Sequence, residues 1–313
     1  MQQPLIFRKR TRRTHDTLWF PWTGDLHRPS TAVATKVYYQ FDDGGQLVIY
    51  LNLLSTIRQE QISKELLTSN GFRQYRVQDN NEPRLHFLLH INGAIDDLAF
   101  DKPQPGYKYG SVQMKARAFG ASFPQVCRLS GTMQRICQAN LVAADGTGNC
   151  ESTGVFWNIG ADCIIYRNGK DQINFHADDD QGEQLILTVL VSTPLECTRK
   201  VLIRNKNGLE EFELFLGAGD AYSMDGTMQQ KYVHAVPRNG KCSGSNAAGT
   251  KSQQRIVIVF RRGNQVIRTK DSGRSVPNLF PPVILPYQYG ELNGLSEGSL
   301  YSRTGLRNLH AHR

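Results

Sequence analysis

The sequence has no hydrophobic run long enough to cross a bilayer. Its longest apolar stretch, residues 47–54, is interrupted by Asn52, whereas a transmembrane helix needs about 20 apolar residues. The basic N-terminal segment is not followed by an apolar one either, so we expect no secretory signal. We therefore predict that the protein does not associate with a membrane.

Cysteine is scarce, and it is not arranged as in disulfide-rich or zinc-binding proteins. The six cysteines stand far apart, and no two of them form a Cys-x-x-Cys pair. Scattered cysteines of this kind fit a reducing compartment. An internal repeat is absent as well. We therefore predict an intracellular protein and expect it to be a monomer.

Basic residues outnumber acidic ones. The chain of 313 residues has a formal net charge of +9 and a pI of about 9.3. This balance favours a polyanionic partner such as nucleic acid, although a merely soluble basic protein would show it too. Five cations within residues 8–13 predict a nuclear targeting signal or a phosphate-binding arm, the alternative being a solvated tail. On this basis we favour DNA over RNA as the partner.

The first half of the chain predicts both helices and strands. Two segments have the helical period, one capped by Ser55. They span residues 55–68, with the apolar stripe Ile57, Ile62, Leu66 and Leu67, and 123 to about 138, with Val126, Leu129, Met133 and Ile136. Two apolar runs predict strands, at residues 44–54 and 84–91. Irregular structure is expected where periodicity is absent or Pro and Gly accumulate, at residues 1–35, 101–110 and 143–154.

From residue 155 onward, short apolar segments alternate with turns, and helical patterns are absent. The segments are VFWNIG, DCIIYR, INFHAD, LILTVLV, RKVLIRN, EFELFLGAG and RIVIVFRR. Short strands at regular spacing predict a sandwich or barrel, and a double-sheet jelly roll fits best. The predicted fold is therefore mainly β with flanking helices (α+β). A double-stranded β-helix core covers residues 151–265, between an N-terminal extension over 36–150 and a C-terminal tail over 266–313.

Two candidate metal ligands stand two residues apart in the segment INFHAD. Side chains of a strand repeat with a period of two, so His176 and Asp178 share a face. They are two members of the 2-His-1-carboxylate triad that holds Fe(II) and leaves open positions. Such a pair also occurs by chance in many chains. The next histidine along the chain, His234, is the only other one between residues 91 and 309, and we predict that it completes the triad.

A pair of arginines could clamp a co-substrate beside such a centre. Open positions on iron suit a bidentate 2-oxo acid and O₂, and the planar fork of arginine binds a carboxylate bidentately. Arg255 and Arg261 lie on one face of an otherwise apolar strand, since an even number of residues separates them. The alternative is that one or both lie at the strand ends and are solvated.

Four segments, in order, resemble the AlkB family of Fe(II)- and 2-oxoglutarate-dependent dioxygenases. Residues 103–110, from a proline to Tyr-Gly, resemble the Pro-x6-Tyr-Gly segment of its nucleotide-recognition lid. Residues 166–169 with 176–180 resemble its Tyr-x2-Gly turn and HxD strand. Residues 231–237 resemble its distal histidine segment, and 255–261 its Arg-x5-Arg strand. The resemblance covers about residues 44–262 and implies an N-terminal lid in front of a jelly-roll core.

The resemblance also implies roles for individual residues. His176, Asp178 and His234 would hold Fe(II), while Arg255, with Tyr166 beside it, would anchor 2-oxoglutarate and Arg261 would lie nearer the iron. For substrate contact it implies Asp180, which could accept from the amine of adenine or cytosine, with a surface acid as the alternative. Tyr109 and Trp157 are aromatic candidates to stack on the base, with ordinary packing as the alternative. The implied reaction is oxidative N-demethylation of methyladenine or methylcytosine, releasing formaldehyde, succinate and CO₂.

Two positions depart from the family pattern. The family commonly has Asn where this chain has Ile164 and Val257, which removes polar groups that would touch the co-substrate. All three predicted metal ligands and both arginines are present, so we expect an active enzyme. The alternatives are a protein or lipid oxygenase on the same fold, because fold does not determine substrate, and a nucleic-acid-binding protein without catalysis.

Overall fold

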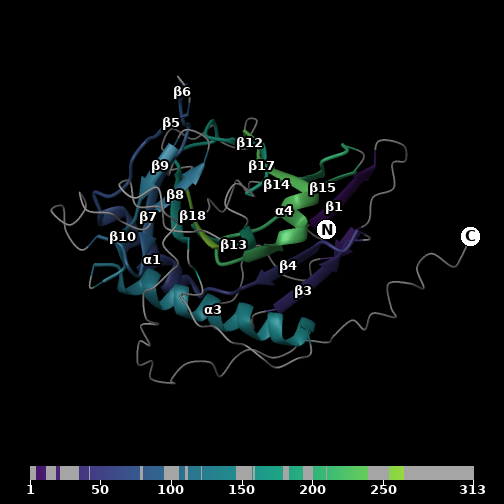
Figure 1. The fold of residues 1–313 in the computed structure, drawn as a ribbon, viewed down its shortest axis with the longest axis horizontal. Helices are drawn as coiled ribbons and strands as arrows, with labels where there is room; N and C mark the ends of the chain where they lie inside the picture. The colour runs from purple at the N-terminus through teal and green to yellow at the C-terminus, as the bar shows by residue number, and fades with distance from the viewer. Residues whose placement is uncertain are drawn as a thin grey trace, which may run out of the picture.

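Two facing β-sheets form the body of the protein. The computed structural model describes residues 5–11, 19–21, 35–41, 43–77, 80–94, 106–109, 112–120, 122–145, 157, 159–178, 183–192, 200–208, 210–238 and 254–263. Within them lie an eight-stranded sheet (the major sheet) and a six-stranded sheet (the minor sheet), and helices α1 and α3 lie together along one side of the fold (Figure 1). This arrangement confirms the predicted jelly-roll class.

The strand orders show how the two sheets are built. The major sheet runs β10-β7-β11-β18-β13-β16-β4-β3, and the minor sheet runs β12-β17-β14-β15-β1-β2. The major-sheet strands are β3 (Thr35–Gln40), β4 (Gln46–Leu51), β7 (Leu85–His90), β10 (Arg117–Ala118), β11 (Gly160–Tyr166), β13 (Glu183–Ser192), β16 (Ala221–Asp225) and β18 (Arg255–Gly263). The minor-sheet strands are β1 (Leu5–Thr11), β2 (Trp19–Pro21), β12 (Ile173–His176), β14 (Lys200–Asn205), β15 (Glu210–Phe215) and β17 (Tyr232–Val236).

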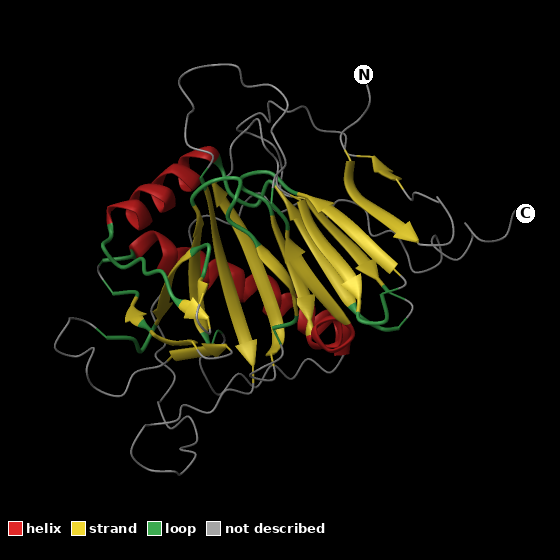
Figure 2. Cartoon of the chain, turned by 90° about the horizontal axis from the view of Figure 1, so that it is seen from above, coloured by secondary structure: helices red, strands yellow, loops and turns green. Residues whose placement is uncertain are grey.

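Among the described residues, the remaining elements are two short hairpins and the helices α1, α3 and α4. The hairpins are β5 (Arg76–Val77) with β6 (Asn80–Asn81), and β8 (Gly106–Tyr109) with β9 (Val112–Lys115). The helices are α1 (Thr56–Thr68), α3 (Pro124–Asp145) and α4 (Gly226–Lys231). Figure 2 shows the helices in red and the strands in yellow.

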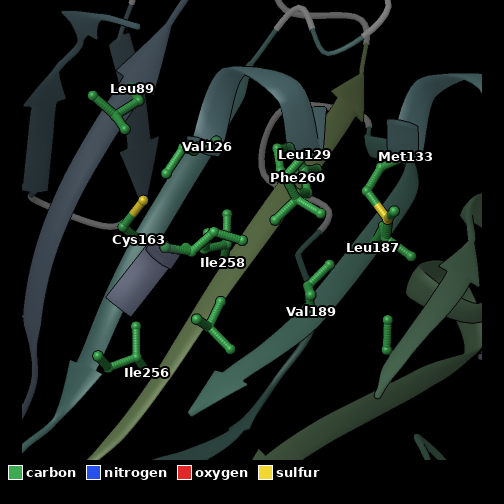
Figure 3. Close-up of a cluster of buried hydrophobic side chains, with 14 of the residues drawn as sticks. Leu89, Val126, Leu129, Met133, Cys163, Leu187, Val189, Ile256, Ile258 and Phe260 are labelled. Atoms are coloured by element: carbon green, nitrogen blue, oxygen red, sulfur yellow. The ribbon is translucent and has the colours of Figure 1, made fainter. Parts of the chain in front are cut away.

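Strand β18 is buried on both faces, which explains the apolar run over residues 256–260. Ile256, Ile258 and Phe260 point to the helix side, where they pack with α3 residues such as Val126 and Leu129 (Figure 3). The alternate residues of the strand, including Val257 and Val259, belong to the core between the two sheets. Because the side-chain period is two, Arg255 and Arg261 point to that inner side as well.

Helix α1 begins as predicted. Ser55 accepts a hydrogen bond from the backbone N of Arg58, as a helix N-cap does. Ile62 and Leu66 are buried on the predicted apolar stripe. The other two members of that stripe are not buried, since Ile57 is 67% exposed and Leu67 is 49% exposed. The apolar face of α1 is therefore narrower than its sequence suggests.

Glu65 of α1 caps the neighbouring helix α3. Its carboxylate oxygens accept hydrogen bonds from the backbone N of Gln125, at 2.8 Å, and of Val126, at 3.0 Å. We expect Glu65→Ala to lower the free energy of unfolding by about 1–2 kcal/mol, because two helix N–H groups lose their acceptor. Denaturant unfolding tests this. The matched control Glu60→Ala, on an exposed position of the same helix, should change stability by less than about 0.5 kcal/mol, and equal losses in the two variants would contradict the capping role.

The predicted N-terminal arm contains two strands, so the expectation of an irregular arm is wrong for residues 5–11 and 19–21. Strand β1 pairs antiparallel with β15, which places Arg8 opposite Glu213 and Arg10 opposite Glu211. The basic segment thus stands beside an acidic strand of the same chain. Strand β1 shows no alternation of apolar and polar residues, so its sequence alone does not predict a strand. It can be recognised only once its partner strand is known.

Several other boundaries differ from the prediction. Residues 106–109 form a strand rather than a loop, while 101–105 lie outside the described residues. Helix α3 continues to Asp145, so residues 143–145 are helical. Of the predicted strand 155–160, residues 157 and 159 form a turn and β11 begins at the last residue, while 155, 156 and 158 lie outside the described residues.

The segment between β15 and β18 holds elements that were not predicted. Residues 221–236 form a strand, the short helix α4 and a second strand, although no helix was expected after residue 155. Strands from both sides of residue 150 belong to the major sheet, so the N-terminal extension contributes directly to the jelly roll.

Candidate metal centre

Three predicted ligands meet at the β12 edge of the minor sheet. Strand β12 pairs antiparallel with β17, and His176 stands directly opposite His234. Asp178 follows β12 by two residues, and one ligand atom from each of the three residues lies within 4.8 Å of the others. The Nε2 atoms of His176 and His234 lie 3.8 and 3.6 Å from the carboxylate of Asp178. The structure thus brings together the triad that the sequence predicts.

Hydrogen bonds orient two of these ligands. His176 Nδ1 lies 2.9 Å from the backbone oxygen of Asn174, so a proton on Nδ1 leaves Nε2 as the ligand atom. The backbone N of Asp178 donates to Oε1 of Gln229 at 3.0 Å. Gln229 belongs to α4, whose N-cap Asp225 accepts from the backbone N of Met228. The unpredicted helix therefore positions a metal ligand.

The charge states of the triad suit a divalent cation. Burial lowers the pKa of both His176 and His234, the latter to about 3, so both imidazoles are neutral near pH 7. Burial alone would raise the pKa of Asp178, but Arg261 and the two histidines together hold that pKa well below its usual range. Two neutral imidazoles and one carboxylate are a donor set that suits Fe(II).

A cavity of about 260 Å³ extends from the triad to Arg255. Arg255 is 1% exposed, and its Nε and Nη1 atoms have no hydrogen-bond partner among the described residues. Burial lowers the pKa of its guanidinium. A buried cation with unused donors is costly, so this end of the cavity fits an anionic ligand with a carboxylate. The alternative that one or both arginines are solvated is wrong, since Arg261 is also buried, at 6% exposed.

Two tyrosines flank Arg255. Its guanidinium carbon lies 5.5 Å from the ring centre of Tyr166, as the predicted pairing requires. Tyr222 of β16 also lines the cavity, and burial raises its pKa to about 12. Its register partner on β13 is Thr188, another cavity residue. These hydroxyl groups are further donors toward a carboxylate at Arg255.

The two departures from the AlkB pattern form one apolar wall of the cavity. Ile164 of β11 and Val257 of β18 are direct cross-strand partners, and both line the cavity. A single amide side chain at either position would be buried beside an alkyl group without a hydrogen-bond partner, which is costly. Two apolar side chains pack against each other without that cost. The wall suits the methylene groups of a 2-oxo dicarboxylate between its two polar ends.

Buried charges continue from Asp178 toward β7. Arg261 lies 3.6 Å from Asp178 and 3.5 Å from Asp162 of β11. His86 of β7 lies 3.1 Å from Asp162. The sequence prediction missed Asp162 and His86, although each is a polar residue that points to the inner face of an apolar strand. Charged side chains are rarely buried without partners, so this signal could have been used.

The predicted substrate residues have different outcomes. Asp180 and the side chain of Tyr109 lie outside the described residues. Trp157 does not line the cavity. It is 3% exposed, packs 5.4 Å from Phe260 on the helix side of the major sheet, and donates from Nε1 to the backbone oxygen of Ser130. Trp157 is therefore a core residue, and the prediction that it stacks on a base is corrected.

Tyr107 is the aromatic residue that reaches the centre. It comes from β8, is 2% exposed and lines the cavity. Its hydroxyl donates to Asp178 Oδ1 at 3.4 Å, and the Arg261 guanidinium lies 4.4 Å from its ring centre. The neighbouring Tyr109, two residues later, was the one chosen from the sequence. The sequence cannot decide between two tyrosines that lie two residues apart when their segment shows no strand pattern.

A jelly roll with a His-x-Asp and distal-histidine centre, joined by a cavity to a buried arginine, defines the class of non-haem iron oxygenases. The sequence pattern of the 2OG-Fe(II) oxygenase superfamily matches residues 46–261, and the chain belongs to this superfamily. Its cofactors are Fe(II), 2-oxoglutarate and O₂. The three ligands and the unused donors of Arg255 fit the metal and the co-substrate respectively.

Three solved structures are similar to the chain at low identity. A prolyl-4-hydroxylase of Pseudomonas putida is 10% identical over 69% of this chain and 92% of that chain, with a TM-score of 0.41. A prolyl hydroxylase of Trichoplax adhaerens, in complex with a hypoxia inducible factor peptide fragment, is 10% identical over 70% and 83%, with a TM-score of 0.43. OsALKBH1 is 13% identical over 72% and 100%, with a TM-score of 0.42. No curated protein matches the chain in sequence. Among the described residues, no helix has both the length and the apolar character to cross a membrane.

Proposed function

We propose that the protein is an AlkB-like dioxygenase that oxidatively demethylates N-methylated bases in DNA. Methyladenine and methylcytosine are the proposed substrates, with formaldehyde, succinate and CO₂ as products. Fe(II) and 2-oxoglutarate supply the oxidising chemistry when bound. The chain's own residues hold the metal, orient the co-substrate and admit the base, and the four sequence segments that resemble AlkB support this choice of substrate.

The β8–β9 hairpin carries the proposal. Its first strand, β8, lies in the segment that resembles the nucleotide-recognition lid, and the inner face of the hairpin buries Tyr107 and Met114, which are register partners. Tyr107 stands beside the metal ligand Asp178, within reach of a group that approaches the iron. A tyrosine ring that lines a reaction cavity can contact a base that has been flipped out of a duplex.

The outer face of this hairpin is basic. Lys108 and Lys115 are exposed, with Gln113 between them on the same face. A flipped base must enter the cavity while its phosphates stay at the surface, and cations beside the entrance would contact those phosphates. The hairpin thus combines an aromatic inner face with a cationic outer face, which suits a nucleic acid better than a peptide or a lipid.

The test is a panel of substrates offered to the Fe(II)-loaded protein. Methylated DNA and RNA oligonucleotides, methylated peptides and fatty acids are compared by iron-dependent succinate release, and mass spectrometry reports the lost methyl group. We expect turnover with methylated DNA. Turnover with peptides or lipids alone would overturn the proposal, as would oligonucleotide binding without any turnover.

The hairpin's contribution can be tested by charge reversal. We expect the double variant K108E/K115E to bind oligonucleotides more weakly and to reduce the slope of log affinity against log salt by about 1 for each phosphate that a lysine no longer neutralises. The control K64E reverses an exposed lysine on α1, on the helix side of the fold, and should leave the slope nearly unchanged. If both variants reduce affinity equally, the effect reflects net charge and the hairpin is not the contact surface.

A further inference from the structure

A row of buried side chains of alternating charge ends at the metal ligand Asp178. Arg261 Nη2 lies 3.6 Å from Asp178 Oδ1, and Arg261 Nη1 lies 3.5 Å from Asp162 Oδ2. Next comes His86, whose Nδ1 lies 3.1 Å from both oxygens of Asp162 and whose Nε2 lies 3.2 Å from Glu82. None of the five residues is more than 6% exposed. Solvent therefore screens these interactions little.

The surroundings of His86 favour its cationic form. Both of its ring nitrogens face carboxylate oxygens, which only accept hydrogen bonds, whereas a neutral imidazole carries a single N–H. Asp162 and Glu82 accordingly raise the pKa of His86, although burial alone would lower it. The other carboxylate in this pair, Glu82, also forms an ion pair with Arg84. Asp162 thus has two cationic neighbours, His86 and Arg261.

The position of Arg261 bears directly on the metal. A guanidinium close to a ligand carboxylate withdraws electron density from it and competes with the metal for its lone pairs. In this structure the guanidinium is shared almost equally between Asp178 and Asp162, and it also lies over the ring of Tyr107. A carboxylate on the far side of Arg261 limits how closely the arginine approaches the metal ligand.

We infer that Asp162 and His86 are positioning residues of the metal centre. Asp162 holds Arg261 away from full pairing with Asp178 and thereby preserves the affinity of the triad for a divalent cation. His86 neutralises part of the charge of Asp162 and so limits how strongly Arg261 is drawn from Asp178. The two residues therefore influence metal affinity in opposite directions. This inference rests on the metal triad and is independent of the substrate.

The competing explanation is that the row only ties β7 to β11. The two strands are neighbours in the major sheet, with His86 opposite Ile164 and Leu88 opposite Asp162. A purely structural tie predicts that removing either group lowers stability and leaves the affinity for metal unchanged. Stability and metal affinity must therefore be measured separately.

The experiment titrates the metal-free full chain with Co(II), followed by its visible absorption, and with Mn(II). For D162N we expect about 10- to 100-fold weaker binding, the usual effect of altering a partner of a metal ligand. For H86Q we expect binding several-fold tighter than in the unchanged protein, because the neutral amide still donates to Asp162 while Arg261 becomes its sole charged partner. The control D171N alters a buried acid that pairs with Arg167 and does not line the cavity, and it should bind metal normally.

Thermal unfolding of the same metal-free samples separates folding from positioning. Unchanged affinity in D162N would overturn the inference, whatever its melting temperature. Should D162N fail to fold, H86Q decides alone: tighter binding supports the inference, and equal or weaker binding overturns it. Because no oligonucleotide is used, failure here would leave the proposed demethylase function untouched, and failure of the substrate panel would leave this inference untouched.

Discussion

Replacing Arg255 by methionine is expected to abolish productive binding of 2-oxoglutarate and, at the same time, to stabilise the protein without ligand. Arg255 is 1% exposed, and two of its nitrogens have no hydrogen-bond partner among the described residues. The folded chain therefore carries the cost of a desolvated cation. Methionine fills a similar volume without charge, so the free energy of unfolding should rise. The thioether cannot bind a carboxylate, so co-substrate affinity should fall.

The expected loss of affinity is large. Removing one partner of a buried charge pair costs about 2–5 kcal/mol, which corresponds to a weakening of about 30-fold to several thousand-fold. Calorimetric titration with 2-oxoglutarate in the presence of Mn(II) measures the affinity, and thermal unfolding measures the stability. The control R255K keeps the charge but loses the planar fork, so it should bind with intermediate affinity. Normal affinity in R255M, or a clear fall in its stability without ligand, would contradict the role of Arg255 as the carboxylate anchor.

Replacing Asp178 by alanine is expected to remove metal binding and turnover while leaving the fold intact. Asp178 is the one anionic ligand of the triad, so its loss should weaken metal binding by more than the roughly 100-fold that an outer partner's loss can cost. The fold should survive for two reasons. The bond to Gln229 comes from the backbone N of Asp178 and persists, and Arg261 keeps Asp162 as a partner.

The histidines strengthen the expectation that D178A folds. Burial lowers the pKa of both His176 and His234. An imidazole whose pKa is lowered by folding is neutral near pH 7, and loss of Asp178, which raises the pKa of both histidines, lowers those pKa values further. Neither histidine therefore becomes an unpaired buried cation when Asp178 is removed. Circular dichroism and thermal unfolding check the fold, and Co(II) titration checks the metal. The control D171A removes another buried acid, which holds Arg167 at 3.0 Å, and it should cost stability but retain metal.

Oligonucleotide binding provides the second readout for D178A. Under the proposed function, nucleic acid binds the outer face of the hairpin, whereas Asp178 holds metal inside the cavity. Affinity for a methylated oligonucleotide should therefore change little in D178A while turnover disappears. Simultaneous loss of oligonucleotide binding in a folded variant would show that Asp178 has a different role.

The residues that the sequence predicted correctly share a local signal. A period of two places His176 with Asp178, and Arg255 with Arg261, on one face of a strand whatever the rest of the fold does. Histidine is so scarce in the C-terminal half that His234 had no competitor between the predicted pair and residue 309. The jelly-roll class followed in the same way from the regular spacing of short apolar strands.

Other features depended on contacts between distant segments. Tyr107 reaches the carboxylate of Asp178 only because β8 pairs with β9 beside the cavity. Gln229 reaches the backbone N of Asp178 only because α4 precedes β17. Trp157 was misjudged because an aromatic residue after a loop looks the same whether it faces α3 or an entrance. Strand β1 was missed because its partner β15 lies about two hundred residues later.

Local patterns in the sequence are enough to predict the composition of the centre: which side chains form the candidate metal site, which arginines face the interior and which class of fold carries them. They are enough because ligand spacing and strand period are properties of a few neighbouring residues. Long-range packing sets how Arg261 is shared between Asp178 and Asp162, how His86 joins that row, and how Tyr107 comes to reach Asp178. Those contacts join strands β7, β8, β11 and β18, and the pairing of distant strands is settled by the packing of the whole sheet.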